Sequence, residues 1–467
     1  MTDAETGVLF RNAEVAGRGR TDVRVAGAGV AEVGRGLARA SGERIVDCRG
    51  AALLPGLWDH HLHLHALWAW RRSTLCGPPA VGGRPGLAAA LRAALPDENG
   101  WVRGVGYAES VAGDLDAAAL DALRADAPVR VQHRSGALWI LNSAAVREAG
   151  LASGGHPGIE RDAHGDPTGR LWRADSWLRE RIPAARTADL GGVGRELAAA
   201  GITGVTDATP DLAPAAIASI EDGGLPQRVH LLGRPLESPP GRNPRVTAGP
   251  YKIVLADSGL PGLDALAARI RAAHAGGRAV AVHCVTRESL LLLLAAFADA
   301  GVRDGDRIEH AALVPPDVIG RLVSLRLRVV TQPGFIADRG DDYLRDVPAA
   351  DRGDLYRCRS LADAGVPVAL SSDAPYGPLD PWLVMDAAVR RRTRSGAAVG
   401  PDESIPASAA LRSYLSAPDD PGGPPRRVRP GAAADLVLLH TDLGGALRSP
   451  DSGAVRHTMI AGRIVEA

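Results

Sequence analysis

The most informative stretch of the chain is Pro55-Gly56-Leu57-Trp58-Asp59-His60-His61-Leu62-His63. In an extended strand, side chains two residues apart point to the same face, so His61 and His63 would present two imidazoles to one cation. His60 and His65 add further histidines nearby. A histidine-rich surface loop would give the same local pattern, so the prediction of a metal site depends on what the rest of the chain supplies.

The segments that follow alternate between candidate strands and candidate helices. Helical stretches such as 263–275 and 290–300 lie between several short apolar segments that resemble buried strands. Eight parallel strands with intervening helices predict an α/β fold of the (β/α)8 TIM-barrel type, with an open doubly wound sheet as the alternative. Pro367 counts against the last candidate strand, because proline has no N–H for a ladder. The eight candidates are 53–57, 204–207, 228–232, 251–255, 279–283, 307–310, 328–332 and 366–370.

The two ends of the chain and one long gap predict further domains. Short β segments near both termini predict a composite β-sandwich domain from residues 1–53 and 426–467. Residues 54–425 would then form the barrel. The gap of about 67–200 between the first and second candidate strands is too long for a plain βα connection. It predicts an inserted subdomain that covers or borders the site.

Two more histidines and an aspartate lie at the ends of candidate strands. His283 and His310 each end an apolar strand, 27 residues apart, and the carboxyl ends of barrel strands converge on the active-site face. Asp373 directly follows the eighth candidate. A carboxylate there can bind metal and accept a proton from a bound water, although an aspartate that starts a turn before Pro375 is the alternative.

Lysine usage singles out Lys252. It is the only lysine among the 54 lysines and arginines, and it lies in the apolar segment 251–255. A buried lysine is costly unless its charge is removed or paired. Lysine can lose its proton and react with CO2 to give a carbamate, an anionic oxygen ligand, whereas arginine cannot be deprotonated. The chance retention of one lysine is the alternative.

Composition excludes several classes of partner. Lysine plus arginine equals aspartate plus glutamate at 54 each, which gives no electrostatic case for nucleic acid or an anionic membrane. The longest apolar run, Leu290–Ala298, is too short to span a bilayer. Four scattered cysteines and an acidic N-terminus without an apolar signal stretch predict a cytoplasmic protein. A small-molecule substrate is the expected partner, and the sequence leaves a monomer and a homo-oligomer both open.

Taken together, these motifs resemble the amidohydrolase superfamily, most closely amidohydrolase family 3, the branch that includes N-substituted formamide deformylase. The resemblance covers nearly all of the chain. Its matching segments are Pro55–His63, Asp166–Gly169, Tyr251–Ile253, Val282–His283, Arg307–Ala311, Ser372–Pro375 and Pro430–Leu436.

The resemblance implies a barrel with a composite β-sandwich and one or two divalent metals, usually zinc. Lys252 would bridge two metals as a carbamate, and Asp373 would be both ligand and general base. The implied reaction is hydrolysis of a non-peptide C–N bond, of amide, formamide or carbamate type, by a metal-activated hydroxide. The implied metal ligands are His61, His63, Lys252, His283, His310 and Asp373.

The insert stretch His133–Ser143 resembles the family's pocket lining. It suggests His133, Trp139 and Asn142 as substrate contacts, together with Gln332. The chain departs from the family at two places: the stretch usually has a histidine at about the position of Ala137, and many relatives have a glutamate where this chain has Arg173. Both departures leave the substrate open.

Two other functions remain as alternatives. Many deaminases of the superfamily have a catalytic glutamate three residues after the fifth-strand histidine, where this chain has Thr286. Their metal sites also usually lack the bridging lysine. Both differences favour hydrolysis of an amide, carbamate or formamide over deamination. A non-catalytic metal-binding scaffold would be expected to have lost at least one ligand, and all six are present.

Overall fold

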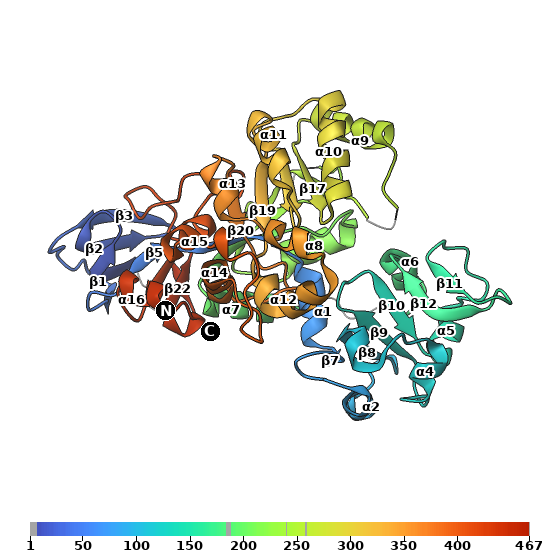
Figure 1. Cartoon of the computed structure of the whole chain (residues 1–467). Helices are drawn as coiled ribbons and strands as arrows, with labels where there is room; N and C mark the ends of the chain where they lie inside the picture. Colours follow the sequence, from blue (N-terminus) through green and yellow to red (C-terminus); the bar gives the residue numbers. More distant parts are fainter. Residues whose placement is uncertain (1–6, 184–187, 240, 257–258, 467) are drawn as a thin grey trace. The chain divides into compact units, whose positions relative to one another are not determined.

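The computed structural model describes residues 7–183, 188–239, 241–256 and 259–466. The chain divides into two compact units (Figure 1). One comprises Met1–Leu64 and Asp189–Ala467, and the other, here called the insert, comprises His65–Ala188. Among the described residues, no helix combines the length and the apolar character needed to cross a membrane.

The first unit contains two sheets of parallel strands. The first sheet has the order β15-β14-β13-β6, and the second has the order β16-β17-β18-β19-β20. The bounds are β6 (Leu57–Leu62), β13 (Ile202–Asp207), β14 (Arg228–Leu231), β15 (Val246–Ala248), β16 (Tyr251–Val254), β17 (Val280–Cys284), β18 (Arg307–His310), β19 (Arg328–Thr331) and β20 (Val368–Leu370).

The predicted α/β class is therefore confirmed, whereas no closed barrel is detected among the described strands. Backbone hydrogen bonds join the two sheets at both of their junctions. The amide N–H of Lys252 donates to Leu232 O at 3.1 Å, and that of Asp373 donates to His61 O at 2.8 Å. The second bond connects the segment after β20 to the end of β6, so the two ends of the strand series meet.

Helices follow most of these strands and cover them with apolar side chains. They include α8 (Pro214–Asp222), α9 (Leu263–Ala275), α10 (Arg287–Ala300), α11 (Ile319–Ser324), α12 (Gly334–Asp346) and α13 (Arg359–Asp363). Figure 1 shows α9 and α10 beside β17. Ile270 and Phe297 are buried there against the outward face of the strands, which stabilises the sheet that holds His283 and His310.

The structure corrects the first predicted strand. Residues 53–57 do not form one barrel strand, because β5 (Leu53–Pro55) pairs antiparallel with β21 (Leu436–Leu439) and β6 begins at Leu57. Gly56 makes the switch possible, since a Cβ there would lie 2.1 Å from Thr203 Cγ2. The last predicted strand, 366–370, also begins later, at Val368, one residue after the proline. Strand β15 was not predicted.

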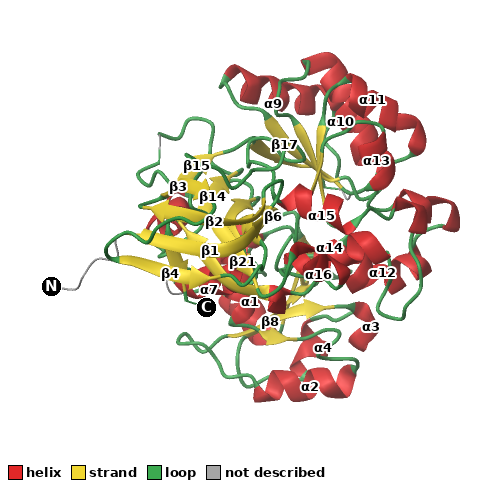
Figure 2. Cartoon of the chain, turned by 90° about the vertical axis from the view of Figure 1, so that its left-hand side faces the viewer, coloured by secondary structure: helices red, strands yellow, loops and turns green. Residues whose placement is uncertain are grey.

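The two termini of the chain form two four-stranded sheets (Figure 2). Phe10 and Val23 share one apolar core with Leu436 and Met459. The boundaries 1–53 and 426–467 for a separate domain stay a prediction. The strands are β1 (Gly7–Val15), β2 (Gly19–Ala26), β3 (Gly29–Gly34) and β4 (Glu43–Asp47) in one sheet, with β5, β21, β22 (Val455–Ile460) and β23 (Arg463–Val465) in the other.

The insert has a six-stranded sheet of its own, ordered β11-β12-β10-β9-β8-β7. Two apolar clusters pack against it, one around Leu87 and Tyr107 and the other around Trp101 and Trp139. Its strands are β7 (Thr74–Leu75), β8 (Val102–Tyr107), β9 (Val129–His133), β10 (Leu138–Leu141), β11 (Ile159–Arg161) and β12 (Pro167–Trp172), and its helices include α2 (Arg84–Ala93) and α5 (Ser143–Glu148).

Candidate metal centre

Strand geometry places the predicted ligands at the carboxyl ends of parallel strands. His61 is the penultimate residue of β6, and His63 is the first residue after that strand. His310 is the last residue of β18. Because neighbouring parallel strands end at the same edge of a sheet, these side chains share one region. Lys252 lies within β16, His283 lies in β17, and Asp373 follows β20.

Asp373 is the point where the ligands meet. Its Oδ1 lies 3.2 Å from His63 Nε2 and 3.5 Å from His61 Nε2. The ligand atoms of these three residues all lie within 4.8 Å of one another, a spacing that suits one cation. On the other side of the carboxylate, Asp373 Oδ2 lies 3.9 Å from His310 Nδ1.

The remaining predicted ligands join the same cluster. The Nζ atom of Lys252 lies 3.5 Å from His61 Nε2. The rings of His283 and His310 have centroids 4.4 Å apart, and those of His61 and His310 are 4.7 Å apart. The structure therefore brings all six predicted side chains together, although their roles as ligands stay a prediction.

Two of these residues have unusual backbone conformations. His310 has φ 70° and Asp373 has φ 54°, and Ala311 has φ 45°. Non-glycine residues in the left-handed region are uncommon and are often found at functional sites, where the surrounding structure holds them in place. Here the backbone N–H groups of Asp373 and His63 donate to His61 O and Ala374 O, which fastens the two strand ends together.

A second layer of side chains orients the imidazoles. The Nδ1 of His61 contacts the carboxylate of Glu309, whose other oxygen accepts a hydrogen bond from Arg307 Nε at 2.5 Å. The Nδ1 of His63 lies 3.1 Å from Thr209 Oγ1. Sequence reasoning missed Glu309, Arg307 and Thr209 as site residues. Alternation along β18 could have identified Glu309 and Arg307, since both would point to the same face.

Asp59 supports the centre from the strand itself. Its Oδ1 accepts hydrogen bonds from the backbone N–H of His61 at 3.1 Å and of Ser372 at 3.2 Å. The side chain is fully buried, and this burial raises the pKa of Asp59 to about 7. Asp59 thus links the ligand segment of β6 to the ligand segment after β20.

Burial controls the electrostatics of the ligands. It lowers the pKa of His61 and of His310 well below the usual value, and the neighbouring cation Lys252 lowers both further. Burial also lowers the pKa of the Lys252 amine, although the nearby carboxylates of Glu309 and Asp373 oppose this shift. Neutral imidazoles are the form that binds metal, so burial favours the ligand state of His61 and His310.

The predicted substrate contacts have several different environments. In the first unit, Gln332 is buried, and its Oε1 accepts a hydrogen bond from His310 Nδ1 at 2.9 Å. In the insert, His133 Nε2 pairs with Glu109 at 3.1 Å, and Trp139 Nε1 donates to Asp175 at 2.8 Å. Asn142 caps helix α5. Their predicted contacts with a substrate stay predictions.

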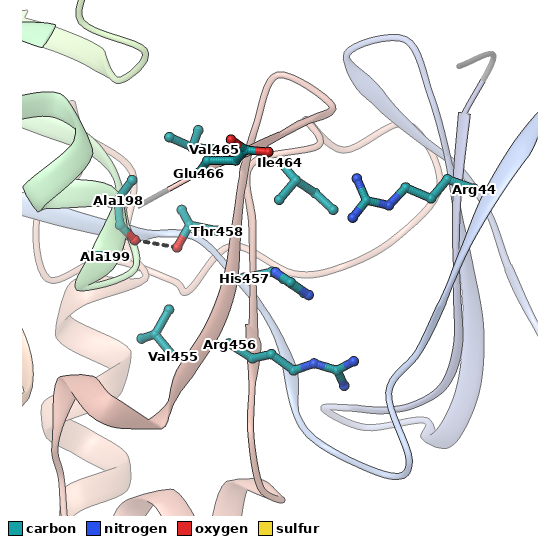
Figure 3. A pocket seen from close by; sticks show the side chains of 10 residues that line it. All are labelled: Arg44, Ala198, Ala199, Val455, Arg456, His457, Thr458, Ile464, Val465 and Glu466. Atoms are coloured by element: carbon teal, nitrogen blue, oxygen red, sulfur yellow. Dashed lines mark hydrogen bonds between the residues drawn. The ribbon is translucent and has the colours of Figure 1, made fainter. Parts of the chain in front are cut away.

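The donor set fits a divalent cation on two observations. Asp373 Oδ1 is buried and has no hydrogen-bond partner among the described residues, which is costly unless a cation or proton compensates it. The surrounding imidazole and carboxylate donors are the ligand types that zinc takes in proteins. A hollow of about 450 Å³ opens elsewhere, and none of the six residues lines it (Figure 3). Its walls include Arg44, Arg456 and His457 of the terminal sheets.

Comparison with known proteins identifies the family. The model of the "Amidohydrolase family" matches residues 44–466. The chain belongs to the amidohydrolase family. The predicted relationship is therefore confirmed, and this amidohydrolase is a hydrolase that acts on carbon–nitrogen bonds.

Individual relatives agree with this assignment. The amidohydrolase YtcJ of Bacillus subtilis (strain 168) is 27% identical in an alignment of 434 residues, and the match covers 79% of each chain. The N-substituted formamide deformylase of Arthrobacter pascens is 33% identical over 140 residues, which are 29% of this chain and 26% of the relative. Among solved structures, an uncharacterised metal-dependent hydrolase from Pyrococcus horikoshii OT3 is similar in fold, with TM-score 0.74 and 20% identity over 98% of this chain and 100% of its own.

Proposed function

We propose that this amidohydrolase cleaves the C–N bond of a small amide, formamide or carbamate at a divalent metal centre, with zinc as the metal, on a closed (β/α)8 barrel. The observation that carries the proposal is the buried, unpartnered Oδ1 of Asp373 beside the Nε2 atoms of His61 and His63. Hydrogen bonds at both junctions of the two parallel sheets support the closed barrel.

The chain's own residues would divide the work. The four histidines at the centre, with Asp373, would hold one or two metals. A bound metal would supply a water of lowered pKa and would polarise the substrate carbonyl. Asp373 accepts the proton of the attacking water and passes it to the leaving nitrogen, so that the C–N bond breaks to a neutral amine. The hydrogen bonds of His61 and His63 through Nδ1 keep the Nε2 atoms of these two rings directed at Asp373.

Lys252 would act as a carbamate when two metals are bound. Its buried amine, once neutral, attacks the carbon of CO2, a new N–C bond forms, and one proton leaves. The product places an anionic oxygen next to His61, where the ammonium group now lies 3.5 Å away. The lowered pKa of Lys252 favours the neutral amine that this reaction needs.

Two observations bear on the substrate. The similarity to N-substituted formamide deformylase covers only 29% of this chain, so formamides are one class among several to test. At the position where many related deaminases have a glutamate, the Thr286 side chain accepts a hydrogen bond from Ser289 N and caps α10. This local role makes hydrolysis of an amide-type bond the better proposal than deamination.

The test combines metal analysis with a substrate panel. Purified protein, with and without added zinc in bicarbonate buffer, is assayed against N-formyl amines, N-acyl amines, carbamates and aminopyrimidines. We expect metal-dependent release of amine from one of the first three classes. Release of ammonia from an aminopyrimidine would instead establish a deaminase, and a protein that binds no divalent metal would refute the proposed centre.

Lys252 offers a separate test of the carbamate. Lys252→Arg keeps a cation but cannot react with CO2, so we expect metal affinity to fall about 10- to 100-fold, as for loss of other groups that support a metal. Lys252→Ala supplemented with a short carboxylic acid is the matched rescue variant. Wild-type metal content and activity in Lys252→Arg would exclude a carbamate.

A further inference from the structure

The second layer treats the three inward-facing histidines unequally. His63 Nδ1 is bonded to a hydroxyl, that of Thr209, at 3.1 Å. His310 Nδ1 is bonded to an amide oxygen, that of Gln332, at 2.9 Å. Among the described hydrogen bonds of these three Nδ1 atoms, only that of His61 Nδ1 is to a carboxylate, Glu309. The carboxylate oxygen nearest His310 Nδ1, Asp373 Oδ2, lies 3.9 Å away, beyond hydrogen-bond distance. A carboxylate accepts a stronger hydrogen bond than a neutral oxygen and raises the basicity of the imidazole that donates to it.

Glu309 is itself held by a cation. The Nε of Arg307 donates to Glu309 Oε1 at 2.5 Å, and both side chains lie two residues apart on β18. Arg307, Glu309 and His61 are all fully buried. The Nη1 and Nη2 of Arg307 have no hydrogen-bond partner in the described part of the chain, so its charge is compensated chiefly through Glu309. A buried pair of this kind is costly as a stabilising device alone.

The geometry points to a relay in which Arg307 and Glu309 are positioning residues that make His61 a stronger imidazole ligand than His63 or His310. With Arg307 donating to one oxygen, Glu309 presents the other as an acceptor for the Nδ1–H of His61. The free lone pair of His61 is then at Nε2, the atom that lies 3.5 Å from both Asp373 Oδ1 and Lys252 Nζ. This inference rests on the proposed metal centre and explains why its imidazole ligands would differ in strength.

A relay of this kind should control metal affinity, whereas a purely structural ion pair should control only the stability of the fold. The structural pair used for comparison is Arg357 with Glu403, in which Glu403 is buried and the Arg357 side chain is 11% exposed, with Arg357 Nη1 at 2.6 Å from Glu403 Oε1. Glu403 bonds to Ser360 and to the backbone of Cys358, and none of the six candidate ligands contacts it in the described hydrogen bonds. Removing either carboxylate should destabilise the fold, but only Glu309 should affect metal binding.

The experiment measures the zinc dissociation constant of the metal-free full chain by competition with a coloured chelator, together with the midpoint of thermal unfolding. For Glu309→Gln we expect affinity to fall about 10- to 100-fold. For Glu403→Gln we expect a lowered unfolding midpoint with wild-type zinc affinity. Equal affinities in Glu309→Gln and wild type would overturn the relay, and so would an equal loss in both variants.

A spectroscopic measurement keeps the inference testable if Glu309→Gln fails to fold. Two-bond ¹H–¹⁵N correlation of metal-free wild-type protein reports which ring nitrogen of each histidine carries the proton, and His61→Asn assigns the signal. We expect His61 to be protonated at Nδ1, and protonation at Nε2 would refute the relay. A wild-type protein that binds no zinc but shows this tautomer would refute the proposed centre while leaving the hydrogen bond to Glu309 in place.

Discussion

The parallel strands of the first unit and the sheet of the insert use similar polar side chains in opposite ways. At the strand ends of the first unit, Asp373 Oδ1 is buried and has no hydrogen-bond partner in the described residues. In the insert, by contrast, Trp139 Nε1 donates to Asp175, and Asn142 makes four hydrogen bonds to the surrounding backbone. Of these three predicted site residues, only Asp373 has a buried polar atom without a hydrogen-bond partner in the part of the chain that the structure describes.

This difference shows why the predicted metal ligands of the first unit are better supported than the predicted substrate contacts of the insert. A buried polar atom is normally satisfied by its own structure, and an exception needs a cause such as a bound ion. The strand ends around Asp373 have such an exception together with a concentration of histidines. The insert residues have their bonding accounted for by the insert itself, so a role in substrate binding has to be shown by experiment.

The largest effect that would test this contrast is expected from Asp373→Asn. The amide keeps the shape of the side chain but cannot accept the proton of the attacking water. We expect the turnover number to fall about 10²- to 10⁴-fold, with the fold retained. The measurement is the turnover number on whichever substrate the panel identifies, with circular dichroism as the control for folding. Wild-type turnover in the variant would remove Asp373 from its proposed role.

The second effect concerns the stability of the buried polar strands in acid. Burial, and then the charges of Arg307 and Arg278, lower the pKa of His230 to about 3. The unfolded chain binds a proton at a pKa of about 6.5, so between these values the unfolded state holds more protons than the folded state. Stability therefore falls as the pH drops below about 6.5, by roughly 3 kcal/mol for this group at pH 4.

Denaturant titrations between pH 7 and pH 4 would measure this loss, and His230→Gln should make the slope shallower. His164 is an exposed histidine of the insert and supplies the control, since His164→Gln should leave the slope unchanged. A slope that is identical in His230→Gln and wild type would show that another group causes the acid sensitivity. The loss of stability in acid would then not arise from His230 in the parallel strands.

The sequence predicted which side chains gather at the strand ends better than it predicted the limits of the strands, while the roles of those side chains as ligands stay a prediction. The six candidate ligands were predicted because metal binding demands particular residue types, and strand ends are where a parallel fold brings them together. The limits of strands depend on partners far away in the chain. Leu53–Pro55 is as apolar as a barrel strand, yet its partner is β21, and only the close approach of Gly56 to Thr203 explains the break.

The second layer was missed for a related reason. Glu309 lies inside a motif that was singled out, but its role depends on two contacts, with Arg307 and His61, of which the second spans 248 residues of chain. Strand β15 has only three residues and follows a loop rich in proline and glycine, which gives little pattern to detect. Local sequence therefore predicts which chemistry is present, whereas long-range packing decides which atoms do it.

The smallest effect is expected in the insert, from Asn142→Ala. The side chain accepts hydrogen bonds from Val129 N at 2.9 Å and Ala145 N at 3.0 Å, and it donates to Arg124 O and Ala127 O. Its loss leaves buried backbone groups unpaired and removes a helix cap, which costs about 1–3 kcal/mol of unfolding free energy.

Catalysis at a temperature where the variant stays folded should be unchanged if Asn142 acts only through the structure of the insert. Glu148→Ala, an exposed change at the end of the same helix, is the control and should alter stability by no more than about 0.5 kcal/mol. The decisive measurements are the KM and the unfolding free energy of Asn142→Ala, each compared with wild type. A raised KM in Asn142→Ala with wild-type unfolding free energy would mean that the side chain contacts substrate, and the contrast between the two regions would fail at this residue.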